Sequence, residues 1–298
     1  MLKYERILVT GASHGIGRRT AVRLGAAGAL IGIVGRSTDA LDEVVAEIER
    51  AGGRAIPFVT DLLDRKSRER LVPEAISCLG GLDRLVNIAG CASFRPFERE
   101  RSNEMSDLVT LNVLAPMELS RQAVQRFRSQ GGGHIVNVGS IFGSIGFPHF
   151  TAYSATKFAL RGFSQALRRE LDGTGVDVTY VAPRGTRTRL AEAFGEMAEA
   201  TNMHLDDPDD VAARIVAAME RRSKDVYLGR AEGIFVRLNS IFPGLVDRLM
   251  KKDTGRARPF AEKACESSGS AALVEQAVAH FGATGEASSE KGGVACRS

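Results

Sequence analysis

Two side chains that could exchange a proton, Tyr153 and Lys157, lie four residues apart in a segment with helical character. On a helix this spacing places both side chains on one face, so that the phenol lies beside the ammonium. A free phenol has a pKa of about 10, and a nearby cation favours the phenolate and lowers that pKa toward neutrality. The pair therefore indicates an acid or base catalyst, with an exposed ring covered by the lysine stem as the alternative.

Three glycines near the start of the chain predict a phosphate-binding turn. Residues 7–10 are an apolar run typical of a buried strand, Gly11, Gly15 and Gly17 follow it, and residues 18–27 have helical character. Glycines let a backbone turn tightly and approach a pyrophosphate, and the amide groups at a helix N-terminus attract its charge. The order of strand, glycine turn and helix therefore favours a nucleotide site over a flexible loop.

The whole pattern resembles the short-chain dehydrogenase/reductase family over roughly residues 5 to 230. The matching residues, in chain order, are the turn from Thr10 to Gly17, Asp61, Asn87, Gly90, Asn112, Ser140, Tyr153 and Lys157. Their order and spacing both fit the family. The resemblance implies an enzyme that interconverts a carbonyl and a hydroxyl group by hydride transfer with a nicotinamide nucleotide.

The resemblance also implies a role for each of four catalytic residues. Tyr153 would donate a proton to the substrate carbonyl oxygen, or remove it in the oxidative direction, and Ser140 would fix and polarise that oxygen. Lys157 would lower the pKa of Tyr153 and hold the nicotinamide ribose. Asn112 would hold a water that links Lys157 to solvent.

The residue after the second predicted strand bears on the choice of cofactor. Arg36 stands where an NAD-preferring relative would place an acidic residue for the ribose 2′-hydroxyl, and it could pair with the 2′-phosphate of NADP instead. Ser37 could add a hydrogen bond, His14 stands where NADP-preferring relatives often carry a basic group, and Arg18 is nearby. We therefore expect NADP(H) to be preferred over NAD(H), with a solvent-facing Arg36 as the alternative.

The resemblance further implies contacts with the adenine and the rest of the cofactor. Asp61 would accept a hydrogen bond from the adenine amino group and Leu62 would supply a backbone contact, although an aspartate after a strand could also cap the next helix. The full set implied to bind the cofactor is Gly11, Ser13, His14, Gly15, Ile16, Gly17, Arg36, Ser37, Asp61, Leu62, Asn87, Ala89, Gly90, Tyr153, Lys157, Pro183 and Thr188.

Two positions depart from the family pattern. Ile88 replaces the second asparagine of the usual Asn-Asn-Ala-Gly, a change for which we expect little catalytic effect. Arg184 follows Pro183 where glycine is customary, in the segment that normally lines the nicotinamide. Arg184 could meet the cofactor pyrophosphate or an acidic substrate, or it could point to solvent.

Apolar runs with helical segments between most of them predict an α/β fold. The runs cover residues 7–10, 30–35, 55–59, 84–88, 134–139, 177–182 and 225–228. Such alternation indicates a parallel sheet with helices on both faces and a ligand crevice at the carboxyl ends of the strands. We therefore predict a doubly wound, Rossmann-type catalytic domain over residues 1–230. The resemblance implies about seven strands, and a homodimer or homotetramer paired through the helices of Asn112 and Tyr153.

Two further segments follow the catalytic domain. Residues 231–252 repeat apolar side chains at helical spacing, and Pro243 is expected to kink or divide this helix. Its apolar face, over residues 234–250, would pack on the protein's own core or a partner subunit, or lie on a membrane interface. Residues 253–298 are rich in Ser, Gly and Ala without apolar periodicity, so we predict a disordered tail.

The composition argues against several other classes of protein. Of the 298 residues, 44% are hydrophobic, which suffices for one large domain. The formal charge of +4 comes mostly from scattered arginines, so we expect no nucleic-acid partner, and the four cysteines lack metal-ligand spacing, so we assign no metal. The start of the chain is too short and charged for a signal peptide, and no apolar run could span a bilayer. We expect a cytoplasmic protein, with peripheral membrane contact as an added option.

Apolar residues near Ser140 and Tyr153, and within a predicted lid over residues 188–207, favour a hydrophobic, lipid-like substrate. They are Phe94, Phe97, Ile141, Phe142, Ile145, Phe147, Phe150, Leu190, Phe194, Met197, Met203 and Leu205. We expect an NADP-dependent oxidoreductase that interconverts a ketone and a secondary alcohol. The alternatives are a catalytically silent NADP-binding module that recruits a partner through its C-terminal region, and an epimerase or dehydratase that uses the same four residues.

Overall fold

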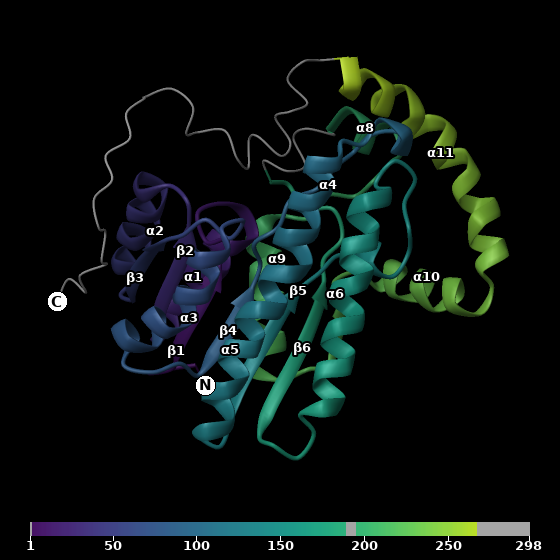
Figure 1. The fold of residues 1–298 in the computed structure, drawn as a ribbon. Helices are drawn as coiled ribbons and strands as arrows, with labels where there is room; N and C mark the ends of the chain where they lie inside the picture. Colours follow the sequence, from purple (N-terminus) through teal and green to yellow (C-terminus); the bar gives the residue numbers. More distant parts are fainter. Residues whose placement is uncertain (1, 189–194, 267–298) are drawn as a thin grey trace.

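The computed structural model describes residues 2–188 and 195–266. Within these residues seven strands form one parallel sheet in the order β3-β2-β1-β4-β5-β6-β7, which confirms the predicted doubly wound Rossmann-type fold (Figure 1). The strands are β1 (Arg6–Thr10), β2 (Leu30–Gly35), β3 (Arg54–Val59), β4 (Arg84–Asn87), β5 (Gly133–Val138), β6 (Val176–Ala182) and β7 (Asp225–Tyr227). Each end differs from its predicted position by one residue at most.

The central strands are apolar on both faces because helices cover both. Every residue of β4 and β5 is buried, which is the pattern of a parallel sheet inside an α/β domain. One face packs on α1 (Gly15–Ala26), α2 (Thr38–Arg50) and α9 (Pro208–Glu220). The other face packs on α3 (Arg65–Leu79), α5 (Ala115–Ser129) and α6 (Thr151–Glu170).

Short elements gather at the carboxyl edge of the sheet, where the predicted site residues lie. After β4 the chain forms a 3₁₀ turn, η1 (Phe97–Arg99), and then α4 (Ser102–Val109). A π-helical turn, η2 (Thr110–Leu114), joins α4 to α5 without a break. After β5 a second 3₁₀ turn, η3 (Ile141–Gly143), leads toward α6.

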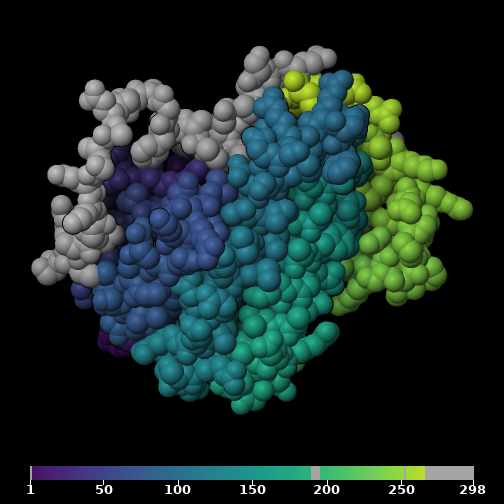
Figure 2. Space-filling model, in the orientation of Figure 1, coloured from purple at the N-terminus to yellow at the C-terminus, as the bar shows by residue number. Residues whose placement is uncertain are grey.

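The C-terminal helices form an arm along one flank of the domain, drawn in yellow-green in Figure 2. It consists of α10 (Arg230–Ile241) and α11 (Pro243–Glu266), with α8 (Gly195–Ala200) beneath the far end. The helix divides at Pro243, as predicted, because proline has no N–H to continue a helix and favours its first turn. Val236 and Val246 pack against Ile141 and Ile145, so part of the predicted apolar face covers the protein's own domain.

The predicted boundary of the disordered tail is wrong, because α11 continues past residue 252 to Glu266. The extra turns are held by Ala257 and Ala261, which are fully buried against Phe94, Phe150 and Met197. Small side chains four residues apart make a packing stripe that a search for large apolar residues overlooks. Residues 267–298 of the predicted tail lie outside the described residues. Among the described helices, none is long and apolar enough to cross a membrane.

Candidate active site

Helix α6 carries two of the four predicted catalytic residues on its first two turns. Tyr153 and Lys157 face the carboxyl ends of β4 and β5, and Lys157 is buried with 4% of its surface exposed. Its Nζ lies 5.6 Å from the centroid of the Tyr153 ring and 3.5 Å from the main-chain oxygen of Val138 at the end of β5. The spacing of four residues thus brings the phenol and the ammonium together, as predicted.

Ser140 lies two residues after the end of β5 and is the N-cap of the turn η3. Its backbone is extended (φ −163°, ψ 160°), and its hydroxyl accepts a hydrogen bond from the N–H of Phe142 at 3.2 Å. The same side chain lies close enough to the phenol of Tyr153 to lower its pKa by hydrogen bonding. The end of a strand and the start of a helix therefore place a serine hydroxyl against the tyrosine hydroxyl, where both can meet one substrate oxygen.

The ionisation of this pair differs from the prediction. Burial raises the pKa of Tyr153 to about 12, and the hydrogen bond from Ser140 opposes this rise. Burial also lowers the pKa of Lys157 to about 8. The expectation that Lys157 brings the phenol pKa toward neutrality is therefore wrong for this structure, because removal from water disfavours both charged forms. At neutral pH Tyr153 keeps its proton and Lys157 keeps most of its charge.

Asn112 lies at the centre of the π-turn η2 with 1% of its surface exposed. Its side-chain oxygen accepts from the N–H of Cys91 (2.9 Å), and its amide donates to the main-chain oxygen of Cys91 (2.8 Å) and to Thr156 Oγ1 (3.0 Å). A Cβ built on Gly90 would lie 2.8 Å from Asn112 Oδ1 and 3.4 Å from Lys157 Nζ. Glycine at position 90 thus lets Asn112 and Lys157 approach the same point.

The glycine turn after β1 has the geometry of a phosphate cradle. Gly11 and Gly15 have positive φ values of 69° and 54°, which strongly favour glycine. A Cβ on Gly17 would lie 2.0 Å from the main-chain oxygen of Gly11, so the first turn of α1 can close only on glycine. His14 is the N-cap residue of α1. The turn and the start of the helix fit the pyrophosphate of a dinucleotide.

Close backbone contacts connect the glycine cradle to the catalytic residues. A Cβ on Gly11 would lie 2.8 Å from the main chain of Ala89, and Gly90 follows beside Lys157. Thr10 Oγ1 fixes this contact by accepting from the N–H groups of Ile88 and Ala89 at 3.1 and 3.2 Å. On the other side of the cradle, the Thr188 methyl group would meet a Cβ on Gly15 at 3.0 Å. A bound dinucleotide could therefore reach from the turn to Tyr153.

The residues expected at the adenosine end lie after β2 and β3. Arg36 is half-buried, and within the described residues it forms no ion pair with a carboxylate. Ser13 lies against Gly35, since a Cβ there would be 2.0 Å from Ser13 Oγ. The Ser37 hydroxyl caps α2 by accepting from the N–H of Ala40 at 3.3 Å. Its own proton stays available to a phosphate.

Other members of the predicted set are engaged with the protein. Asp61 Oδ1 accepts from the N–H of Leu63 (2.9 Å), whereas Asp64 is the N-cap of α3. The main-chain oxygen of Leu62 accepts from Arg68 (2.7 Å). Arg18, expected near the adenosine phosphate, pairs instead with Glu43 and Glu47 at 3.1 and 2.8 Å. These carboxylates remove Arg18 from the candidate phosphate ligands.

Two predicted cofactor residues hold neighbouring strands together. Asn87 is buried, and its amide donates to Asn137 Oδ1 at 2.9 Å and to Ser120 Oγ at 3.3 Å. The main-chain oxygen of Pro183 accepts from the N–H of Ile141 at 2.9 Å. Both contacts set the positions of β4, β5 and β6 at the edge where a nicotinamide would lie. Ile16, the remaining residue of the turn, packs into the core.

Arg184, the departure in the family pattern, pairs with two carboxylates. Its guanidinium donates to Asp206 through Nε (2.9 Å) and Nη2 (2.8 Å), and through Nη1 to Glu232 on α10 (3.1 Å). Arg184 therefore does not simply point to solvent, and two carboxylates already balance the charge that could meet a pyrophosphate or an acidic substrate. Arg184 instead links the end of β6 to the segment before α9 and to the C-terminal arm. Its two carboxylate partners are 22 and 48 residues away in the sequence, so local spacing does not predict these contacts.

Aromatic rings pack around Tyr153. The ring centroids of Phe142 and Phe150 lie 6.3 and 6.2 Å from that of Tyr153. Phe94, Phe147, Met197 and Met203 complete the cluster with α11. Of the residues predicted to line this side, Phe97 is exposed instead, and Leu190 and Phe194 lie outside the described residues.

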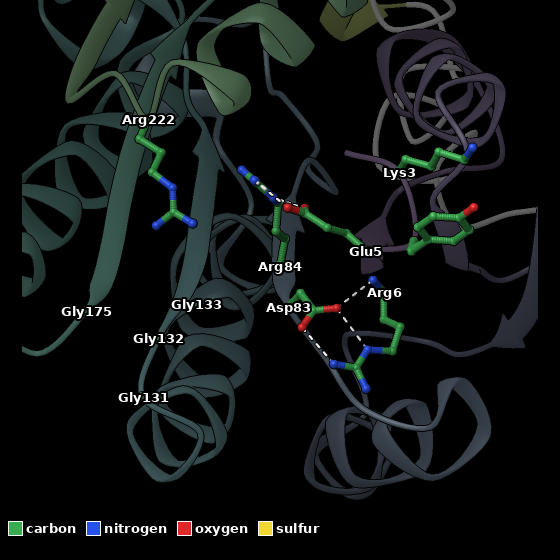
Figure 3. A pocket seen from close by; sticks show the side chains of 11 residues that line it. Lys3, Glu5, Arg6, Asp83, Arg84, Gly131, Gly132, Gly133, Gly175 and Arg222 are labelled. Atoms are coloured by element: carbon green, nitrogen blue, oxygen red, sulfur yellow. Dashed lines mark hydrogen bonds and ion pairs between the residues drawn. The ribbon is translucent and has the colours of Figure 1, made fainter. Parts of the chain in front are cut away.

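A depression of about 520 Å³ lies at the opposite, amino edge of the sheet (Figure 3). Arg6, Arg84 and Arg222 line it together with Glu5 and Asp83, and backbone glycines form its floor. Each arginine has a carboxylate partner: Asp83 for Arg6, Glu5 for Arg84 and Asp177 for Arg222. The three arginines are therefore paired, Lys3 gives the lining an excess of positive charge, and none of the predicted site residues lines the depression.

Some residues of the site carry no local signal in the sequence. The π-turn around Asn112 follows ordinary helical residues, although an asparagine within a helix is a weak hint of an irregular turn. Cys91 lies beside Asn112, and burial raises the pKa of its thiol to about 12, so it remains protonated. Tyr180 on β6 contacts Ser140 through its hydroxyl. The sequence does not indicate this contact, because Tyr180 lies in an apolar run that looks like an ordinary core strand.

Comparison with known proteins agrees with this geometry. The short chain dehydrogenase family model matches residues 5–199. An uncharacterised oxidoreductase of Bacillus subtilis, YxnA, is 32% identical over 258 residues, which are 84% of this chain and 72% of that protein. The bovine dehydrogenase/reductase SDR family member 7B is 31% identical over 268 residues, covering 85% of this chain and 82% of the relative.

Solved structures give the same result. A short-chain dehydrogenase from Streptomyces avermitilis superposes with a TM-score of 0.72 at 31% identity, over 82% of this chain and 96% of that one. A short chain dehydrogenase from Burkholderia cenocepacia, solved in complex with NADP, gives a TM-score of 0.71 at 33% identity, over 76% and 96% of the two chains. The glycine cradle, the edge that gathers Tyr153 and Ser140, and these matches together show that the chain belongs to the short-chain dehydrogenase/reductase family of oxidoreductases.

Proposed function

We propose that the protein is an NADP-dependent reductase or dehydrogenase that interconverts a hydrophobic ketone and its secondary alcohol, with Asn112, Ser140, Tyr153 and Lys157 as its catalytic residues. The observation that carries the proposal is that the Ser140 side chain lies close enough to the Tyr153 phenol to lower its pKa by hydrogen bonding, while Gly90 brings the chain from the glycine cradle beside Lys157. Two hydroxyl groups at one point can bind a carbonyl oxygen, and one of them can protonate it.

Proton transfer would start from Tyr153. Because burial raises its pKa to about 12, the phenol holds its proton at neutral pH and donates it when negative charge develops on the substrate oxygen. Ser140 would bind the same oxygen and orient it. Lys157, 5.6 Å from the ring centroid, would stabilise the phenolate that remains after proton transfer.

A nicotinamide nucleotide, when bound, would supply the hydride. The glycine turn would bind its pyrophosphate, Thr188 would contact the nicotinamide end, and Lys157 would bind the ribose. The side-chain amide of Asn112 is engaged with Cys91 and Thr156. Any water relay at Asn112 would therefore use its main-chain carbonyl, in a π-turn where the regular pattern of helical hydrogen bonds is interrupted.

The preference for NADP rests on Arg36. This half-buried guanidinium follows β2, at the end of the strand where a dinucleotide places its adenosine ribose. A guanidinium can bind a 2′-phosphate through two parallel hydrogen bonds, and no carboxylate among the described residues competes for it. The relative from Burkholderia cenocepacia was solved with NADP, which is compatible with this choice.

A hydrophobic substrate is supported by the rings beside Tyr153. Phe142 stacks on Phe147 with ring centroids 5.0 Å apart, and Phe150 lies against Phe94 at 4.8 Å. Met197 and Met203 add flexible side chains that adapt to different ligand shapes. Apolar side chains beside the proposed proton donor favour a bulky, largely apolar ketone over a sugar or a small acid.

The test combines cofactor binding and turnover. NADPH binding is followed by fluorescence, and reduction of lipid, steroid and sugar ketones is followed for the wild type and for Tyr153→Phe. We expect binding by both proteins and turnover of apolar ketones by the wild type alone. Binding without turnover that depends on Tyr153 would favour the silent module, and a product that retains the redox state of the substrate would favour an epimerase or dehydratase.

We also propose that the subunits pair through the helices of the site. Val109, Leu114, Met117 and Phe158 are exposed by 40 to 52% on the outer sides of α4, η2, α5 and α6. Large apolar side chains gathered on one surface favour burial in a subunit interface. Light scattering should give a dimer or tetramer for the wild type and a smaller species for Phe158→Glu, and a monomeric wild type would refute the pairing.

The arm offers a second apolar surface, for which we propose peripheral contact with a membrane. Ile241, Phe242 and Leu249 are exposed by 67, 58 and 52%, near the exposed cations Arg248 and Lys251. An apolar edge with a basic border suits an anionic bilayer surface. The wild type should float with anionic vesicles and Phe242→Ser should float less, whereas absence of the wild type from the vesicle fraction would refute the contact.

A further inference from the structure

We infer that Tyr180 positions Ser140 for the reaction, an inference that rests on the proposed function. Tyr180 lies on β6, and its side chain is fully buried. Its hydroxyl donates a hydrogen bond to the main-chain oxygen of Ser140 (3.2 Å) and accepts one from the N–H of the same residue (3.4 Å). One phenol thus holds both main-chain polar groups of the residue whose side chain binds Tyr153.

The turn around Ser140 is shaped to admit this phenol. A Cβ on Gly139 would lie 2.2 Å from the Tyr180 hydroxyl oxygen, and a Cβ on Gly143 would lie 2.6 Å from it. Neither glycine is among those with a positive φ. The space taken by the Tyr180 ring, and not the backbone conformation, therefore requires glycine on both sides of Ser140.

The ring also connects Ser140 to the catalytic helix. Tyr180 packs with Leu160 and Phe163 of α6, the helix that carries Tyr153 and Lys157. Burial raises the pKa of Tyr180, so the phenol keeps the proton that it donates to Ser140. Tyr180 therefore sets the distance between the serine turn and the helix that bears the proton donor.

Loss of the Tyr180 hydroxyl would act through Ser140. The Ser140 N–H would lose its partner in a partly buried place, its C=O would keep only the N–H of Gly143 (3.0 Å), and the turn would shift to satisfy the N–H. The Ser140 hydroxyl would then move relative to Tyr153. A displacement of about 1 Å at a catalytic group can lower the rate on the order of 100-fold.

The first test is Tyr180→Phe, which keeps the ring and removes the hydroxyl. We expect kcat to fall on the order of 10- to 100-fold while NADPH binding stays within about twofold of the wild type. Tyr227→Phe is the matched control, because it makes the same change in the same cluster and its hydroxyl contacts Ser144 Oγ at 3.3 Å instead of Ser140. A wild-type kcat in Tyr180→Phe, or an equal loss in both variants, would overturn the inference.

A double-mutant cycle separates positioning from general destabilisation. If Tyr180 acts through Ser140, then Tyr180→Phe should add no further loss of kcat to Ser140→Ala, because the group that it positions is already absent. Losses that multiply would show that Tyr180 acts elsewhere and would overturn the inference.

A readout without turnover keeps the inference distinct from the proposed function. The hydrogen bond from Ser140 lowers the pKa of Tyr153 against the effect of burial. Displacing Ser140 in Tyr180→Phe should therefore raise the pKa of Tyr153, which NMR of ¹³C-labelled tyrosine can follow with Tyr153→Phe as the assignment control. An unchanged pKa would overturn the inference even if the wild type reduced no ketone.

Discussion

A buried histidine at the amino edge of the sheet should make this fold sensitive to acid. His134 on β5 is fully buried, and its Nδ1 lies 2.6 Å from Nη1 of Arg84 on β4. Because a guanidinium can only donate, Nδ1 must accept, and the ring proton lies on Nε2. Nε2 lies 2.9 Å from Thr179 Oγ1, which donates to the main-chain oxygen of Ser223. The neutral ring is thus fixed in one tautomer.

Protonation would place an N–H of the ring against the Arg84 guanidinium. Burial, together with the charge of Arg84, lowers the pKa of His134 from 6.5 to about 3. Between these values the unfolded chain binds a proton that the folded chain does not, so stability falls as the pH drops below about 6.5. At about 1.4 kcal/mol per pH unit, the loss between pH 7 and pH 5 is about 2 kcal/mol.

The measurement is urea unfolding of the wild type and His134→Gln at pH 7 and pH 5. Glutamine can accept from Arg84 and donate to Thr179, but it does not titrate. Other acid-sensitive groups, including Glu5 beside Arg84 (Figure 3), are common to both proteins and cancel in the comparison. The wild type should lose about 2 kcal/mol more than the variant. An equal loss in both proteins would refute the role of His134.

Four further outcomes follow from the site. Gly17→Ala should abolish NADPH binding measured by fluorescence, because its Cβ would lie 2.0 Å from the Gly11 oxygen; binding within about twofold of wild type would contradict this. Arg36→Glu should lower the ratio of kcat/KM for NADPH over NADH on the order of 100-fold, because a carboxylate repels a 2′-phosphate; an unchanged ratio would remove Arg36 from the phosphate site. The rate of ketone reduction should fall as the pH rises through about 8, where Lys157 loses its charge; a flat profile to pH 10 would argue against a charged Lys157. Arg184→Gly should speed hydrogen exchange in α10, because Glu232 loses its partner, and equal exchange would show that other contacts hold the arm.

The sequence by itself determined the sheet and the membership of the candidate site. Each strand is a short apolar run, and the proposed site residues either follow a strand end or lie within a predicted helix, so local pattern and covalent spacing are sufficient to find them. Gly11 and Gly17 indicate a tight turn, because a larger residue would clash there. The spacing of four residues between Tyr153 and Lys157 indicates a shared helix face, because it matches the helical period. The roles of these residues in catalysis stay predictions.

Only the tertiary structure decided which side chains, far apart in the sequence, contact each other. Arg184 finds Asp206 and Glu232, and Tyr180 finds Ser140 forty residues away. Ala257 and Ala261 extend the final helix by packing on distant rings. The same holds for charge, since burial by the whole fold raises the pKa of Tyr153 to about 12 where the spacing alone suggested a lowered one. Partners and burial depend on residues far apart in the chain, which no local pattern contains.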